Sequence, residues 1–190
     1  RIKLRMKKWR IKNKERIRKG VVYLEKILPD IFEKYHDVYL VHVGEPFQWK
    51  VLEWCKKRII QAGRISWSKM KEYYASCDLI VSCSLHEMFP NTIIEAMAAG
   101  IPVISSNIQG VSEYIEHMKD GYVFKRGENN ELVKAISFML DNPGIAKKMA
   151  KTKIKRIDYT KYCSSLLEFI LDKDKKSVSL LLSENSPGLP

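Results

Sequence analysis

Two kinds of hydrophobic pattern alternate along the chain, and together they predict alternating helices and strands. Residues 21–35 and 129–141 place apolar side chains three or four positions apart, which predicts amphipathic helices that pack one face on a core. Short apolar runs predict buried strands at residues 38–43, 79–83, 103–105 and 122–124. This alternation favours the α/β class, in which the strands form a mostly parallel sheet.

The remaining segments carry weaker patterns. Residues 47–61 predict a helix whose candidate core positions are Trp49, Leu52, Trp54, Cys55 and Ile59. Ser68 is expected to cap the next helix, because its hydroxyl can accept a hydrogen bond from a free backbone N–H. Residues 145–171 predict one or two more helices, and residues 172–190, rich in Lys and Ser, predict a disordered tail.

One stretch, residues 84–104, carries the candidate chemistry. Its sequence, SLHEMFPNTIIEAMAAGIPVI, predicts a loop, a helix that Pro90 and Asn91 open and Gly100 closes, and a further strand. The stretch follows the predicted strand at 79–83, and in open α/β sheets ligands bind just beyond the carboxyl ends of strands.

Two carboxylates flank the start of this predicted helix: Glu87 in the loop and Glu95 eight positions later. Between them, the first-turn N–H groups of Asn91, Thr92 and Ile93 have no partner within the helix and suit a phosphate. Carboxylates suit hydroxyl groups instead. The arrangement therefore fits a ligand with phosphate in its middle and polyols at both ends, which is the shape of a nucleotide-sugar. The plainer alternative is that Glu95 is an exposed helix acid.

The whole string closely resembles the donor-binding segment of retaining glycosyltransferases with the GT-B fold, particularly glycosyltransferase family 4. In that family two glutamates with seven residues between them stand in a string of the form Ser-x-x-Glu-Gly-Phe-Pro-Asn-x-x-x-Glu-Ala-Met-Ala. Met88 stands where the family usually has glycine. The resemblance covers about residues 20–171 and implies a Rossmann-like three-layer domain, the C-terminal half of such an enzyme. The acceptor-binding N-terminal half is then missing from this chain.

The resemblance also implies roles for individual residues. Glu87 is the implied catalytic residue, near the reacting carbon of the donor sugar, and Glu95 would bind the ribose hydroxyls. The other implied donor-binding residues are Lys19, Gly44, Phe89, Pro90, Asn91 and Thr92. No metal or cofactor is implied. The expected donor is a UDP- or GDP-linked sugar, and the expected acceptor is a glycan or a lipid-linked saccharide. A non-catalytic nucleotide-sugar-binding module is the alternative.

Charge is concentrated at one end. Residues 1–20 hold eleven Lys or Arg and one acid, whereas the rest of the chain holds 23 basic and 21 acidic residues. Residues 1–19 therefore form a basic arm or the remnant of a first strand. This arm is either solvated or attracted to anionic lipid or nucleic acid, with nucleic acid the weaker alternative. Lys14 and Lys19 within it are either diphosphate ligands or solvated charges.

Cysteine usage and hydropathy bear on the compartment. The four cysteines show no paired spacing, which predicts a reducing, cytoplasmic compartment. Contact of the basic arm with a membrane surface stays open as an addition to that prediction. His42, inside a predicted strand, is expected to be structural rather than catalytic.

Overall fold

The computed structural model describes residues 14–87 and 91–154. The chain divides into two units, Arg1–Ile154 and Lys155–Pro190. The second unit lies outside the described residues, as do the predicted tail at 172–190 and the part of the predicted terminal helices beyond residue 154. The first unit contains the candidate site.

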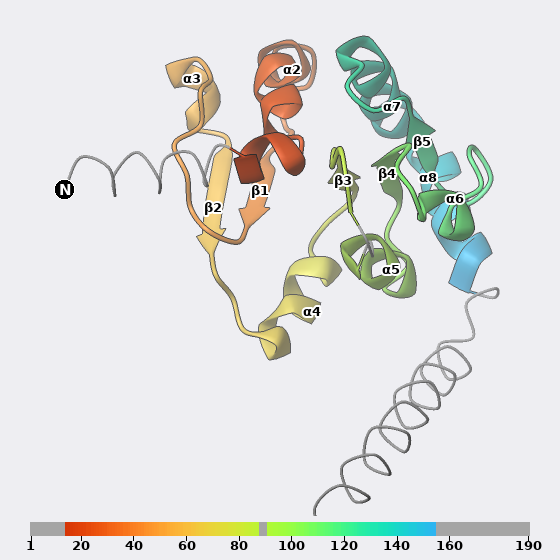
Figure 1. Ribbon diagram of the computed structural model, residues 1–190. Helices are drawn as coiled ribbons and strands as arrows, with labels where there is room; N and C mark the ends of the chain where they lie inside the picture. The colour runs from red at the N-terminus through yellow and green to blue at the C-terminus, as the bar shows by residue number, and fades with distance from the viewer. Residues whose placement is uncertain (1–13, 88–90, 155–190) are drawn as a thin grey trace, which may run out of the picture. The chain divides into compact units, whose positions relative to one another are not determined.

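Helices and strands alternate through the first unit (Figure 1). A short helical segment at residues 14–18 precedes them. The elements are α2 (Val21–Lys34), β1 (Leu40–Val43), α3 (Glu53–Lys56), β2 (Ile59–Gly63), α4 (Trp67–Ala75), β3 (Ile80–Ser82), α5 (Asn91–Ala98), β4 (Val103–Ser106), α6 (Val111–Tyr114), β5 (Tyr122–Phe124), α7 (Asn129–Asp141) and α8 (Pro143–Ile154).

The described strands pair in parallel throughout. β1 pairs with β2, and β4 lies between β3 and β5 in a separate sheet. The predicted α/β class with parallel strands is thereby confirmed. The described strands form two sheets rather than one. Residues 1–13 of the predicted basic arm or strand remnant lie outside the described residues, and residues 14–18 are helical rather than a strand.

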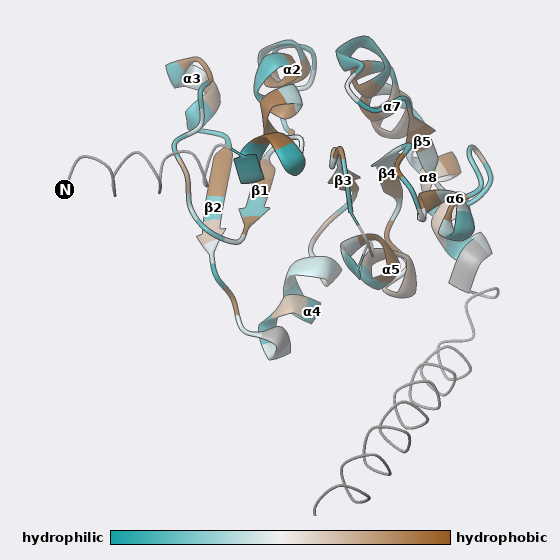
Figure 2. Cartoon of the chain, in the orientation of Figure 1, coloured by the Kyte–Doolittle hydropathy of each residue, from teal (hydrophilic) through white to brown (hydrophobic). Residues whose placement is uncertain are grey.

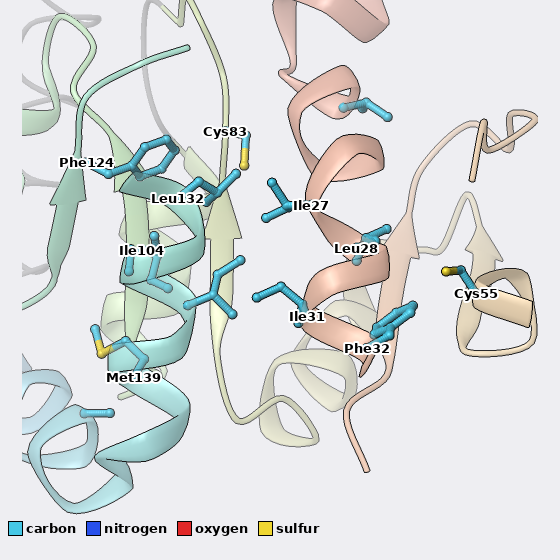
Figure 3. Close-up of a cluster of buried hydrophobic side chains, with 14 of the residues drawn as sticks. Ile27, Leu28, Ile31, Phe32, Cys55, Cys83, Ile104, Phe124, Leu132 and Met139 are labelled. Atoms are coloured by element: carbon cyan, nitrogen blue, oxygen red, sulfur yellow. The ribbon is translucent and has the colours of Figure 1, made fainter. Parts of the chain in front are cut away.

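Helix α2 provides the centre of the core. Its side chains Ile27 and Ile31 face Leu132 of α7, while Phe32 lies on the side of α3 (Figure 3). Phe32 and Leu132 are fully buried. Full burial of one such side chain contributes roughly 1.5–3 kcal/mol relative to leaving it exposed. The helix ends one residue before its predicted end at residue 35, and Pro29 inside it does not break it.

Hydrophobic residues concentrate on the strands and on one side of the longer helices (Figure 2). In α7 the buried residues are Leu132, Ala135, Ile136 and Met139. The helix predicted at residues 129–141 is therefore confirmed, as is the strand at 122–124. A helix that buries one face repeats apolar residues every three or four positions, and a strand buried on both faces is a short apolar run.

The helix predicted over residues 47–61 is wrong. Only Glu53–Lys56 are helical, and Ile59–Gly63 form strand β2, in which Ile59 pairs with Leu40 of β1. Two adjacent β-branched isoleucines favour a strand once a parallel partner is available. Trp49 and Cys55 are buried as expected, but the predicted core positions Leu52 and Trp54 are 56% and 42% exposed.

The predicted cap of the next helix is also misplaced. Helix α4 begins at Trp67, so Ser66 rather than Ser68 occupies the N-cap position. The two hydroxyls lie 3.0 Å apart and hydrogen-bond to each other. Both serines suit a cap by residue type, which is why the sequence alone did not separate them.

Candidate functional site

The candidate site centres on the loop that follows β3. Gly20, which precedes α2, has a φ of 70° and lies directly against this loop. A Cβ atom at Gly20 would lie 1.8 Å from the backbone oxygen of Cys83, so only glycine fits there. The backbone N–H of Leu85 donates to the oxygen of Arg18 over 2.8 Å. The chain just before α2 is thus fixed against residues 83–85.

This close approach brings two cations onto Glu87. Lys19 Nζ donates to Oε1 of Glu87, and Ser84 Oγ donates to the same oxygen over 3.1 Å. Arg18 Nη1 donates to Oε2 of Glu87 over 3.1 Å. The Glu87 side chain is only 16% exposed. Burial alone would raise the pKa of Glu87, but the hydrogen bonds and charges of Lys19 and Arg18 hold it below its usual range.

Further contacts fix the loop backbone. Ser106 Oγ, at the end of β4, donates to the carbonyl of Ser84. Arg126 donates to the carbonyl of Leu85 over 3.3 Å, and Arg18 donates to the carbonyl of His86 over 3.1 Å. The loop is therefore held from β4, from residues 125–127 and from the segment before α2. This arrangement supplies a rigid support for the Glu87 carboxylate.

A second carboxylate is fixed on helix α5. Ile93, Ile94, Ala96 and Met97 bury one face of this helix, whereas Asn91 and Thr92 in its first turn are exposed. Glu95 is half-buried and accepts a 2.6 Å hydrogen bond from the hydroxyl of Tyr74 on α4. The first-turn N–H groups of α5 have no acceptors within the helix and carry its positive dipole end.

The other predicted donor-binding residues have different positions. Gly44 directly follows β1, has a φ of 128° and donates its N–H to the oxygen of Gly63 over 2.9 Å. Phe89 and Pro90 lie outside the described residues. Lys14, at the start of the described residues, is exposed. The structure thus brings Lys19 and Glu87 into contact and places Thr92 and Glu95 on one helix.

Sequence reasoning missed two partners at these carboxylates, Arg18 and Tyr74. Arg18 stands in a run of basic residues, where one cation is not distinguishable from the next. Tyr74 lies 21 positions before its partner Glu95, and no local spacing relates the two. Ser84 is the first residue of the string, and the sequence assigns it no role.

His42 has a structural environment. Its ring lies 4.7 Å from Phe47 and 5.8 Å from Trp49, both in edge-on geometry. Burial lowers the pKa of His42 and favours the neutral ring. These ring contacts fit a structural role, although within the described residues Nδ1 of His42 is buried without a hydrogen-bond partner.

Within the described residues, no group of three or more His, Cys, Asp or Glu side chains has the geometry to hold a metal ion. No helix in the same residues combines the length and apolar character needed to cross a bilayer.

Comparison with known families decides the class of the protein. The family model described as "Glycosyl transferases group 1" matches residues 8–156. The chain belongs to this family. The candidate site lies within the matched residues, and the α/β architecture is similar to GT-B glycosyltransferase structures.

Curated relatives include an uncharacterized glycosyltransferase of Haemophilus influenzae, which is 28% identical over 147 residues. That match covers 74% of this chain and 42% of the relative. Spore coat protein SA of Bacillus subtilis is 35% identical over 124 residues, covering 58% of this chain and 33% of the relative. This glycosyl transferase group 1 chain thus spans less than half the length of these curated relatives.

Solved structures agree in fold. Anabaena Alr3699/HepE in complex with UDP gives a TM-score of 0.66 at 21% identity, covering 82% of this chain and 46% of that one. The C-terminal domain of a glycosyl transferase group 1 family protein from Francisella tularensis gives 0.65 at 22% identity. That match covers 77% of this chain and 81% of that domain.

Proposed function

We propose that this chain is the donor-binding, C-terminal half of a retaining glycosyltransferase. It would transfer a hexose from a UDP- or GDP-linked donor to a glycan or lipid-linked acceptor. The observation that carries the proposal is the Glu87 carboxylate, which Lys19 and Arg18 hold in the loop between β3 and α5. The match to the glycosyl transferase group 1 family supports the same reading.

The mechanism we propose begins with an exchange of partners. A diphosphate carries more negative charge than a carboxylate and would draw Lys19 and Arg18 away from Glu87. The N–H groups at the start of α5 would bind the same diphosphate. Glu87, freed from the two cations but still hydrogen-bonded to Ser84, could then accept hydrogen bonds from the donor sugar.

Catalysis would rest on the leaving diphosphate. As the bond between sugar and phosphate breaks, negative charge grows on the diphosphate, and fixed cations and N–H donors stabilise it more than they stabilise the bound donor. Lys19 and Arg18 would supply this stabilisation, and Glu95 would bind the ribose hydroxyls. We propose that the reaction proceeds without a metal ion and with retention of the anomeric configuration.

A second candidate function follows from the coverage of the relatives. Because the chain spans only 42% of the Haemophilus influenzae relative, it would act as a nucleotide-sugar-binding module that needs a partner domain for turnover. Assays of this chain beside a longer form containing the N-terminal half separate the two candidates. Turnover by this chain alone would contradict the module reading.

Thermal-shift measurements with UDP-, GDP- and ADP-linked sugars test the proposed function. We expect one nucleotide class to raise the melting temperature of the wild type, because a ligand that binds only the folded state stabilises it. Lys19→Ala should reduce this shift. Lys34→Ala, which removes an exposed lysine paired with Asp141 over 3.1 Å, is the matched control and should leave the shift unchanged. Absence of any shift at millimolar ligand would contradict the proposal.

A further inference from the structure

Tyr74 connects helix α4 to the candidate donor site. Its side chain is 7% exposed, and its hydroxyl donates to Oε2 of Glu95 over 2.6 Å. Among the side chains that the structure describes, Tyr74 alone donates a hydrogen bond to the Glu95 carboxylate, and none donates to the other oxygen, Oε1. The carboxylate therefore has one oxygen fixed by the protein and a second oxygen able to accept from a ligand.

The environment of Tyr74 makes it a steady hydrogen-bond donor. Burial raises the pKa of Tyr74, and the neighbouring Glu95 raises it further, while hydrogen bonding with Thr92 opposes these effects. The phenol thus keeps its proton throughout the neutral range. Its hydroxyl donates to Glu95, which lies one turn after Thr92 on α5.

A fixed carboxylate binds a diol more tightly than a free one. A glutamate side chain loses rotamer freedom when it is immobilised, and this loss opposes binding unless it has already occurred in the free protein. A hydrogen bond to a charged acceptor is stronger than one between neutral groups, so a buried phenol is an effective restraint on Glu95. Helix α5 alone fixes the backbone of Glu95 but leaves its side-chain torsions free.

We propose that Tyr74 is a positioning residue that holds the Glu95 carboxylate so that its outward oxygen accepts a ribose hydroxyl of the donor. The inference rests on the proposed function, in which Glu95 binds the ribose. It adds a residue from α4, outside the 84–104 stretch, to the apparatus that recognises the nucleotide.

Titration calorimetry on the full chain with matched nucleotides tests the inference. The wild type is first titrated with UDP, GDP and ADP, and the tightest binder is then compared with its 2′,3′-dideoxy form. We expect the wild type to prefer the ribonucleotide about 10-fold or more. Tyr74→Phe should reduce this preference to about twofold, because it should lower the affinity for the ribonucleotide and leave the affinity for the dideoxy form unchanged. Tyr73→Phe removes a hydroxyl from the neighbouring position on α4 and should keep the full preference.

Each other outcome identifies what fails. Equal weakening of both nucleotides by Tyr74→Phe would reduce Tyr74 to a general structural role and overturn the inference. An unchanged preference in Tyr74→Phe, or none in the wild type, would also overturn it while leaving nucleotide binding intact. Failure of all three nucleotides to bind the wild type would overturn the proposed function itself.

A double variant keeps the test decisive if Tyr74→Phe alone does not fold. Glu95→Ala together with Tyr74→Phe removes both partners, and so leaves no half-buried carboxylate without its donor. Against a Glu95→Ala background, Tyr74→Phe should change nucleotide affinity less than twofold, because the residue it positions is gone. A further loss of about 10-fold in that background would contradict the proposal.

Discussion

Replacing Gly20 with alanine is expected to destabilise the protein by roughly 2–5 kcal/mol. Two costs add. A non-glycine residue at a φ of 70° costs about 1–2 kcal/mol. The new Cβ would also lie 1.8 Å from the backbone oxygen of Cys83. A backbone atom cannot move aside as the end of a flexible side chain could. Overpacking of this kind costs typically 1–3 kcal/mol.

Gly63→Ala is the matched control, because Gly63 has a φ of 71° and nothing lies within 4 Å of its Cβ position. It should show only the conformational cost of about 1–2 kcal/mol. Urea unfolding followed by circular dichroism measures both variants in one assay. The excess loss of stability in Gly20→Ala measures the close approach of Gly20 to Cys83 in the loop after β3. Equal losses in the two variants would show that residues 18–20 do not lie against the loop after β3, and would remove the support for Lys19 at Glu87.

Three further predictions concern the two carboxylates and their cations. Glu95→Ala should weaken binding of the preferred nucleoside diphosphate about 10- to 100-fold in titration calorimetry, and an unchanged affinity would exclude Glu95 from the site. Arg18→Ala should weaken binding of the nucleoside diphosphate more than binding of the corresponding nucleoside, because Arg18 is proposed to bind phosphate. Equal loss of affinity for both ligands would argue against that role. Because the pKa of Glu87 is lowered in the folded state, its contribution to stability is present above the unfolded pKa and is lost as pH falls through the lower folded pKa. Glu87→Gln should therefore flatten the acid side of a curve of unfolding free energy against pH, and a curve parallel to that of the wild type would contradict the ion pairs.

Residues with a strong periodic pattern allowed the fold to be predicted well. Helices α2 and α7 and strand β5 lie within one residue of their predicted bounds. Strand β2 was missed because its two isoleucines fit either a helix or a strand, and only pairing with β1 decides between them. The segment 47–61 alone could not show this pairing, because the partner strand β1 lies about twenty positions earlier in the sequence.

The residues of the candidate site could likewise be predicted only in part. The string around Glu87 and Glu95 pointed to both carboxylates, and the resemblance of Lys19-Gly20 to a Lys-Gly pair of the family pointed to Lys19. Arg18 and Tyr74 reach these carboxylates over 69 and 21 positions of sequence. Such contacts depend on how α4 and the segment before α2 pack in three dimensions. Side-chain partners of that kind can be identified only from the three-dimensional structure.

The central claim is that the loop after β3 and the first turn of α5 bind the diphosphate of a nucleotide-sugar. Backbone amide chemical shifts of the ¹⁵N-labelled chain, followed by NMR during titration with UDP, GDP and ADP, test it most directly. We predict that one nucleotide shifts the backbone amides of Lys19, Leu85, Asn91, Thr92 and Ile93. Shifts confined to β1, β2 and the residues between them, or no shifts at millimolar nucleotide, would contradict the account.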